Sequence, residues 1–399
     1  MDAVYLDHAA TTPMVPEAVD AMTALLTATG NASSLHGPGR AARRVVEESR
    51  ERIAAVLGCS PVEVVLTSGG TEADNLALKG LFWRRRAGDP RRTRLLVSAV
   101  EHHAVLDPAL WLAEHEGAEL ELLPVDTDGR LLLEALEVAV ARDPGSVALV
   151  SVMAANNEVG TRQPVHEVVA TAHSHGVPVH VDAVQAVGHL EVDLAEWGAD
   201  AVALTAHKLG GPYGVGALVL GRGLDPEPLL HGGGQERDVR SGTLDPPAVA
   251  AFAAALDVAV RRRDRLAGDL ARLRERLVDG VRGLVPDVIV NGPVDAADRL
   301  PHIAHLSFPG CEGDSLLMLL DAHGVACSTG SACSAGVPQA SHVLLAMGRD
   351  EATARSSLRF SLGHTTTDAD VDRLLSVLGP VVERARAAGG LTAAGRARA

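Results

Sequence analysis

Short, continuous apolar runs alternate with longer amphipathic stretches from about residue 60 to residue 220, and this alternation constrains the fold most. The apolar runs occupy residues 62–67, 95–100, 147–154, 177–181, 201–205 and 216–220. Helical patterns separate several of them, for example at 72–83 and 165–175. Buried strands that alternate with helices are typical of an α/β domain whose mainly parallel sheet is covered on both faces.

The rest of the chain predicts a second, smaller domain. Residues 246–285 form one long helical pattern with few breakers, and a helix at 313–323 follows. Strand-like pieces at 288–290, 303–307 and 357–361 give this part an α+β character. We expect a large domain over 15–262 and a small domain over 263–385. An N-terminal segment over 1–14 should pack with the small domain. The Ala-, Gly- and Arg-rich tail over 386–399 should be disordered.

Charge and cysteine content exclude several classes of protein. The formal net charge of -15 argues against a nucleic-acid or anionic-membrane partner, since both need a basic face. No run of about 20 apolar residues predicts a membrane span, and no signal peptide is visible. The four cysteines are too few for a disulfide scaffold and lack metal-site spacing, so we expect no metal site and a cytoplasmic location. They are Cys59, Cys311, Cys327 and Cys333.

Polar residues follow two of the apolar runs, at the point where the predicted strands end. A glycine turn at Gly69–Gly70 opens a helical stretch, and Thr71 can serve both as helix N-cap and as a phosphate ligand. Free N–H groups at a helix start favour anions. Asp182 ends a later run, where it is either an ordinary turn residue or the partner of a cationic ring nitrogen. Ligands bind at this edge of parallel sheets, so these side chains can share a site.

A lysine follows the next strand run. The chain has only two lysines, and Lys79 has the position of a solvated charge late in a helix. Lys208 lies instead between an apolar run and a glycine turn. An amine in that place can form a Schiff base with an aldehyde cofactor.

The ordered set Gly-Gly-Thr, Asp-x-x-Gln and Thr-x-His-Lys resembles the cysteine desulfurases, a class V group of the fold type I pyridoxal-phosphate enzymes. The resemblance covers nearly the whole chain, from Tyr5 to about Val371. Further matching stretches are 5–13, 30–36, 101–103, 156–160, 232–237, 240–244, 331–333 and 357–361. It implies a large domain with a mainly parallel, seven-stranded sheet and a smaller α+β domain.

The resemblance also implies roles for individual residues. Lys208 would hold pyridoxal 5'-phosphate, Asp182 would pair with its ring nitrogen, and His102 would stack on the ring and move protons. The adjacent His103 is the alternative to His102 by spacing alone. The cofactor-binding residues it implies are Gly70, Thr71, His102, Asn157, Asp182, Gln185, Thr205, His207, Lys208 and Thr243.

The substrate and the partner subunit also enter through the resemblance. Arg359 would hold the substrate carboxylate, for which a guanidinium fork has the right geometry, and Asn157 and Asn31 would line the same site. Thr243 would reach the phosphate of the neighbouring subunit, which implies a homodimer. Thr243 can alternatively be the N-cap of the helix that follows.

Cys333 lies in a stretch of small and polar residues, 326–341, which predicts a mobile loop. A thiol on such a loop can reach a substrate sulfur and then carry it outward. The loop resembles that of the group I, long-loop desulfurases. Cys327 is an additional thiol, either structural, which we favour, or able to resolve a persulfide on Cys333 as a disulfide.

The function implied is conversion of L-cysteine to L-alanine, with the sulfur passed to Cys333 as a persulfide. The expected acceptor is a protein of iron–sulfur cluster assembly or tRNA thiolation, and a DNA-sulfur-modification partner stays open. A selenocysteine lyase, an aminotransferase and a kynureninase-like hydrolase are rivals on the same scaffold, although an aminotransferase needs no such thiol. A scaffold protein without catalysis is the rival from another class, and the intact Lys208, Asp182 and Cys333 argue against it.

Overall fold

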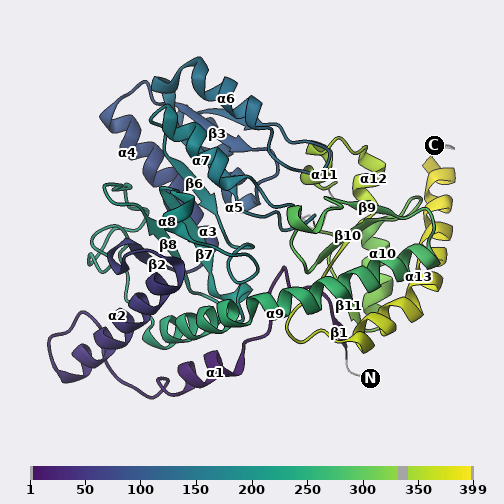
Figure 1. The fold of residues 1–399 in the computed structure, drawn as a ribbon, viewed down its shortest axis with the longest axis horizontal. Coiled ribbons are helices and arrows are strands. Elements are labelled where there is room, and N and C mark those ends of the chain that lie inside the picture. Colours follow the sequence, from purple (N-terminus) through teal and green to yellow (C-terminus); the bar gives the residue numbers. More distant parts are fainter. Residues whose placement is uncertain (1–2, 331–339, 397–399) are drawn as a thin grey trace.

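The computed structural model describes residues 3–330 and 340–396, and its largest element is a seven-stranded sheet (Figure 1). The strand order is β2-β8-β7-β6-β5-β3-β4. The pairs β7-β6, β6-β5, β5-β3 and β3-β4 are parallel, and β8 is antiparallel to both of its neighbours. The strands are β2 (Val64–Thr67), β3 (Arg94–Ser98), β4 (Glu119–Leu123), β5 (Val147–Met153), β6 (Val179–Asp182), β7 (Ala201–Thr205) and β8 (Gly216–Leu220).

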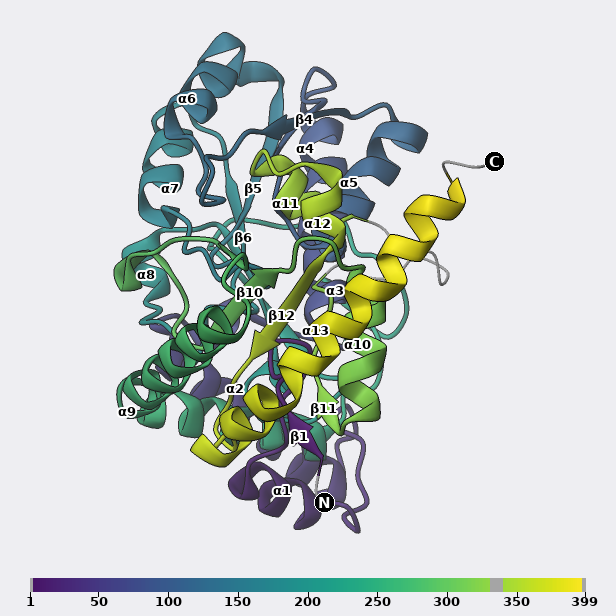
Figure 2. The ribbon, with the colours of Figure 1, turned by 90° about the vertical axis from the view of Figure 1, so that its right-hand side faces the viewer.

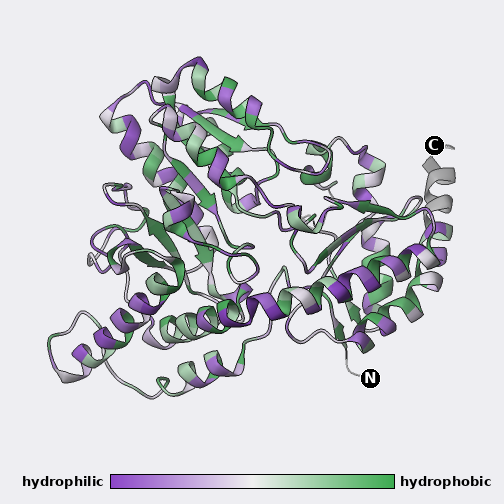
Figure 3. Ribbon diagram, in the orientation of Figure 1, coloured by the Kyte–Doolittle hydropathy of each residue, from purple (hydrophilic) through white to green (hydrophobic). Residues whose placement is uncertain are grey.

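Helices cover both faces of this sheet, as the continuous apolar strands predict. One layer shares a core with α2 (Gly37–Leu57), α6 (Leu133–Arg142) and α7 (Val165–Ser174). The opposite layer consists of α3 (Gly70–Asn75), a π-helical turn (Leu76–Gly80), α4 (Leu81–Gly88) and α5 (His103–Glu116). Figure 3 shows the strands as hydrophobic and the surrounding helices as mixed, which is the pattern of a sheet buried between two helical layers.

A second, three-stranded antiparallel sheet has the order β12-β10-β9. Its strands are β9 (Ile289–Asn291), β10 (Ile303–Ser307) and β12 (Ser357–Ser361). Helices α10 (Gly313–Ala322) and α13 (Asp368–Arg396) pack beside it and contribute to a separate apolar core (Figure 2). The N-terminal strand β1 (Val4–Tyr5) pairs in parallel with β11 (Val325–Ala326), next to this core.

One helix joins the two cores. Helix α9 (Pro246–Leu284) is 39 residues long and runs from the large sheet to the small one (Figure 1). Its first half, up to Val258, packs in the core of the large sheet. From Leu270 onward it packs in the core of the small sheet. The remaining helices are α1 (Pro16–Thr23), α8 (Leu194–Trp197), α11 (His342–Ala346) and α12 (Glu351–Arg355).

The expected disorder of the tail over 386–399 stays a prediction. Helix α13 is described as far as Arg396. Alanine has the highest helix propensity of any residue, and the tail's alanines therefore favour continuing a helix that has already formed. Within the described ranges, no helix is long and apolar enough to cross a membrane.

Candidate active site

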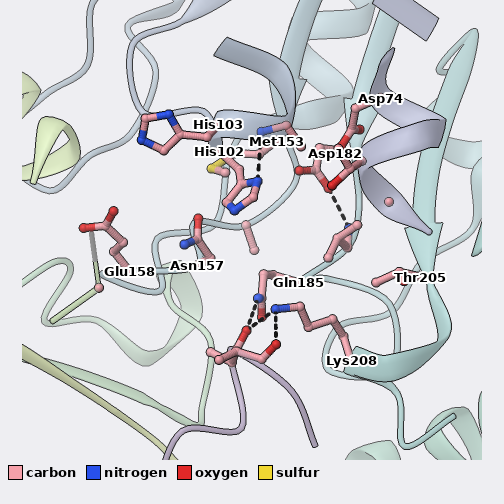
Figure 4. A pocket seen from close by; sticks show the side chains of 18 of the residues that line it. Asp74, His102, His103, Met153, Asn157, Glu158, Asp182, Gln185, Thr205 and Lys208 are labelled. Carbon is pink, nitrogen blue, oxygen red and sulfur yellow. Dashed lines mark hydrogen bonds between the residues drawn. The ribbon is translucent and has the colours of Figure 1, made fainter. Parts of the chain in front are cut away.

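A cavity of about 410 Å³ opens where the parallel strands of the large sheet end. Met153, Asp182 and Thr205, which are the last residues of β5, β6 and β7, all line it. Most of the predicted site residues meet here (Figure 4). They are Gly70, Thr71, His102, Asn157, Asp182, Gln185, Thr205, His207, Lys208 and Arg359.

The glycine turn after β2 brings the start of α3 to the cavity. Gly69 precedes the helix at φ 153°, a conformation that residues with a side chain rarely adopt. A Cβ on Gly70 would lie 2.9 Å from the Val184 Cγ2 atom, so glycine is needed for this close approach. The N-cap position belongs to Gly69, and the prediction that Thr71 caps the helix is therefore wrong. Thr71 still lines the cavity, and a threonine in the first turn of a helix has groups that can bind an anion.

Lys208 comes from the 3₁₀ turn after β7, and its ammonium is directed at the N-terminal segment. Its Nζ atom donates hydrogen bonds to the carbonyl oxygens of Ala9 and Ala10 (Figure 4). Burial, together with the Arg359 guanidinium, lowers the pKa of Lys208 to about 8. An amine with a depressed pKa is a better nucleophile and base near neutral pH.

Asp182 offers a buried carboxyl to the same space. Its Oδ1 atom accepts a hydrogen bond of 2.9 Å from the Val184 backbone N–H. Burial, and then the neighbouring carboxyl of Asp74, raises the pKa of Asp182 to about 7. A buried cation nearby would reverse that shift and keep the carboxyl ionised. Gln185 donates to the Ala9 carbonyl at 2.9 Å, which leaves its second amide N–H for another acceptor.

His102 and His103 both reach the cavity, but only His102 points into it (Figure 4). His102 is the N-cap of α5, and its Nδ1 atom accepts the Ala104 N–H at 3.1 Å. That bond fixes the tautomer with hydrogen on Nε2. Burial and the Lys208 charge lower the pKa of His102 to about 4, so the ring is neutral. His103 instead pairs with Asp107 on the outer side, at 2.9 Å.

Arg359 reaches the cavity from β12 of the small sheet. Its guanidinium donates to the Asn157 carbonyl at 2.9 Å and pairs with Asp7 at 2.7 Å. Its Nε atom has no hydrogen-bond partner among the described residues. A buried guanidinium with an unused donor is suited to a small carboxylate.

Two predicted residues do not line this cavity, and a third lies outside the described residues. Asn31 lies on an exposed loop and accepts a hydrogen bond from the Ser33 N–H. Thr243 is exposed and does not line the cavity, and the N-cap of α9 is Asp245, so the capping alternative for Thr243 is wrong. Cys333 lies outside the described residues.

The chain on either side of Cys333 is nevertheless placed. Ser328 and Gly330 before it, and His342 after it, line the cavity. Ser341 donates to the Glu158 carboxylate at 2.5 Å.

Cys327 is buried in the small core, and burial raises the pKa of its thiol to about 12. The thiolate form of Cys327 is therefore scarce near neutral pH.

Two acidic residues of the cavity wall were not predicted. Asp74 lies on α3 three residues after Thr71, and Glu158 follows Asn157. The i, i+3 spacing on a helix places Asp74 on the same face as Thr71, and this spacing was a usable signal.

Within the described part of the chain, no group of three or more His, Cys, Asp or Glu side chains is placed to hold a metal ion.

The donor set fits pyridoxal 5'-phosphate. An amine of lowered pKa, an acid for the ring nitrogen and a glycine turn with hydroxyls for a phosphate surround one cavity. The fold and the site therefore define a pyridoxal-phosphate enzyme of fold type I.

Comparisons with known proteins lead to the same class and narrow it. The class V aminotransferase family matches residues 4–374, and the chain belongs to this family. An IscS-like cysteine desulfurase of Mycobacterium tuberculosis is 55% identical over 99% of this chain and 100% of its own length. A solved structure described as a NifS-like protein is 35% identical, with a TM-score of 0.87 over 96% of this chain and 99% of its own.

A third comparison concerns a bound substrate. A structure described as SspA in complex with cysteine is 30% identical, with a TM-score of 0.76 over 90% of this chain and 98% of its own. Within its family, the chain is a pyridoxal-phosphate-dependent cysteine desulfurase.

Proposed function

We propose that this chain removes sulfur from L-cysteine in the cavity beside Lys208, releases L-alanine, and carries the sulfur on Cys333 to a protein acceptor. The observation that carries the proposal is the position of Lys208, whose buried amine of depressed pKa faces Asp182 across one cavity. The segment that contains Cys333 begins and ends at the same cavity.

The cofactor would be held at three places by residues of this chain. Lys208 would bind its aldehyde carbon, Asp182 its ring nitrogen, and Gly70, Thr71, Thr205 and His207 its phosphate. When bound, the cofactor supplies an electron sink that labilises the substrate α-proton and the bond from the β-carbon to sulfur. The second amide N–H of Gln185 would donate to the ring's phenolic oxygen.

Lys208 would move the substrate α-proton. A neutral amine is needed for this, and its pKa of about 8 makes a substantial neutral fraction available near neutral pH. The tautomer of His102 carries hydrogen on Nε2, so in this state the ring can donate a hydrogen bond but cannot accept a proton at that atom.

Arg359 would bind the substrate carboxylate through its unused Nε–H and neighbouring N–H groups. Asn157, whose backbone carbonyl already fixes the Arg359 guanidinium, would face the substrate from the same side. The assignment of Asn31 to the substrate has no support from its place on an exposed loop.

Cys333 would attack the substrate sulfur as a thiolate. Gly330 lies on the cavity wall. Cys333 lies three residues further along the chain, and three residues can span at most roughly 10 Å, a chain length that permits the proposed attack. The bond from the cysteine β-carbon to sulfur breaks as the new sulfur–sulfur bond forms. The electron pair from the broken bond stays with the carbon, which takes up a proton on the way to alanine.

Partners follow from the same proposal. We expect a homodimer in which the exposed Thr243 contributes to the neighbouring subunit's phosphate site, and a cytoplasmic acceptor of iron–sulfur cluster assembly or tRNA thiolation. The loop that carries Thr243 is held firmly, because Arg240 pairs with Glu72 at 2.8 Å and Arg50 with Glu236 at 2.7 Å.

Two single substitutions test the role of Cys333. Cys333→Ala and Cys327→Ala, each loaded with cofactor, are given L-cysteine and a thiol reductant while alanine and sulfide are measured. We expect Cys333→Ala to lose at least 100-fold in the rate of both products and Cys327→Ala to change it less than threefold. Comparable losses in both variants would contradict the assignment of Cys333 as the sole sulfur carrier.

A further inference from the structure

Asp74 is a buried carboxyl on the cavity wall for which the proposed function has no role. Only 1% of the residue is exposed, and its Oδ1 atom has no hydrogen-bond partner among the described residues. Figure 4 shows Asp74 and Asp182 on the same wall. A buried carboxyl oxygen without a hydrogen-bond partner is costly, so the surroundings of this atom need an explanation.

His180 supplies a partner for Asp74. It lies on β6 two residues before Asp182, fully buried, and its Nε2 atom is 3.3 Å from the Asp74 Oδ1 atom. The Nε2 atom also lacks a hydrogen-bond partner among the described residues. Two unpartnered atoms that face each other are both satisfied by one proton between them, after a shift of a few tenths of an ångström.

Burial decides which atom holds that proton. It raises the pKa of Asp74 well above its usual range, and it lowers the pKa of His180 to about 4. Both shifts favour the uncharged forms, a carboxylic acid and a neutral imidazole. Asp74 then donates to His180 Nε2, and the Nδ1–H of His180 donates to the Ser151 hydroxyl at 2.9 Å.

The other titratable groups around Asp74 fit a neutral pair. Strands β7 and β8, which pack against α3, carry none. Helix α5 presents an apolar face to α3. Its His103 and Asp107 pair with each other on the exposed side. Lys208 acts on Asp182 through its charge.

Glu101 is the third buried acid of this region. Burial raises its pKa well above the usual range, and it accepts a hydrogen bond from the Met153 N–H at 2.6 Å. Burial raises the pKa of Asp182 as well, to about 7. The Asp74 Oδ1 atom faces His180, and Glu101 is not among the described residues that line the cavity, so of the three acids Asp182 is the one placed to face a cation that binds there.

We propose that Asp74 and His180 share one proton as a neutral buried pair, which leaves Asp182 as the ionised carboxyl that faces the cofactor ring. Asp74 and His180 are positioning residues, because they act on the cofactor through Asp182 and through the cavity wall to which Asp182 belongs. This inference rests on the proposed assignment of Asp182 to the ring nitrogen.

Infrared difference spectra of the cofactor-loaded enzyme at pH 8 test where the proton lies. The spectrum of wild type minus Asp74→Asn should contain the C=O band of a protonated carboxylic acid. The matched spectrum of wild type minus Asp182→Asn should lack it. The proposal is overturned if the Asp74→Asn difference shows only carboxylate bands.

Cofactor affinity tests the positioning role. An asparagine at position 74 keeps a donor toward His180 Nε2, so Asp74→Asn should bind pyridoxal phosphate within threefold of wild type. Asp74→Leu leaves that atom unpaired and should weaken binding at least tenfold. Equal affinities in wild type and both variants would overturn the positioning role.

The variant Asp182→Asn distinguishes a failure of the proposed function from a failure of the further inference. If this variant binds the cofactor as tightly as wild type does, the assignment of Asp182 fails. The infrared comparison on Asp74 still decides whether the neutral pair exists.

Discussion

The environment of Lys208 sets its reactivity at the scale of single residues. The side chain is partly buried, and its ammonium donates hydrogen bonds to two backbone carbonyls. Carbonyls compensate a charge less well than an ion pair does, so burial dominates and the pKa falls to about 8. The neutral amine that an aldehyde requires is therefore accessible at a pH where a solvated lysine is almost fully protonated.

This lowered pKa predicts how the cofactor-free enzyme captures pyridoxal phosphate. The rate of capture, followed by absorbance, should rise with pH and level off above an inflection near 8. An α-blocked lysine in solution is the control and should show its inflection near 10.5. An inflection near 10 in the enzyme as well would contradict the buried, carbonyl-bound amine.

The same shift has a consequence for stability. Between the folded pKa of about 8 and the ordinary value of 10.5, the unfolded chain binds more protons than the folded one. The free energy of unfolding of the cofactor-free protein should therefore rise with pH across this interval. Lys208→Met should lose this dependence, which urea titrations at pH 7.5 and 9.5 would measure. An unchanged pH dependence in the variant would contradict the assignment.

Sequence patterns predicted residues at strand ends better than residues on loops. Asp182 and Lys208 follow apolar runs, and the end of a parallel strand has a fixed place in the fold. Asn31 lies on an exposed loop, where local pattern does not determine its direction. The N-cap role expected of Thr71 fails because the turn places Gly69 at that position.

At the scale of elements, one buried ion pair holds helix α2, strand β2 and the loop before α9 together. Arg50 of α2 donates to both Glu236 carboxylate oxygens and to the Val64 carbonyl. Glu236 also accepts the Leu66 N–H of β2 at 2.8 Å. Both side chains are almost fully buried. Their removal from water is compensated only while the pair and its hydrogen bonds are intact.

Glu236→Gln should therefore destabilise the protein strongly. The substitution leaves a buried guanidinium without its counter-charge, and we expect a loss of roughly 3–5 kcal/mol in the free energy of unfolding. Asp225→Asn removes the partner of Arg84 in an exposed pair and should cost less than about 1 kcal/mol. Urea denaturation measures the free energy of unfolding of both variants. Small losses of similar size in the two would contradict the stabilising role of the Arg50–Glu236 pair.

Elements with a strong periodic or apolar signal were predicted, and elements with a mixed signal were not. Strands β7 and β8 have the predicted bounds. The edge strand β4 was missed because its residues are half-exposed and alternate between acidic and apolar.

At the scale of the whole molecule, a histidine that follows a strand of the large sheet contacts a histidine that precedes a strand of the small sheet. His189, which follows β6, stacks on His302, which precedes β10, with ring centroids 3.8 Å apart. Burial lowers the pKa of His189 to about 4, and burial lowers that of His302 well below its usual range. The predicted division at residue 263 stays a prediction, although α9 does continue from one core into the other.

Acid should weaken the folded chain through these histidines. Between the ordinary pKa of 6.5 and the folded value of about 4, the unfolded state binds more protons, so stability falls as pH falls. Each such histidine contributes up to about 1.4 kcal/mol per pH unit. His189→Gln should flatten the pH dependence of the urea midpoint between pH 6.5 and 4.5, whereas the exposed His166→Gln should not. Identical slopes in all three proteins would contradict this.

The most direct test of the proposed sulfur path is a single turnover. One equivalent of L-cysteine is added to the cofactor-loaded enzyme without reductant, and the products and the digested chain are analysed by mass spectrometry. We predict one alanine per active site and one added sulfur atom on the peptide that contains Cys333, with none on the peptides of Cys59 and Cys311. Alanine formed while Cys333 gains no sulfur would contradict the proposed sulfur path.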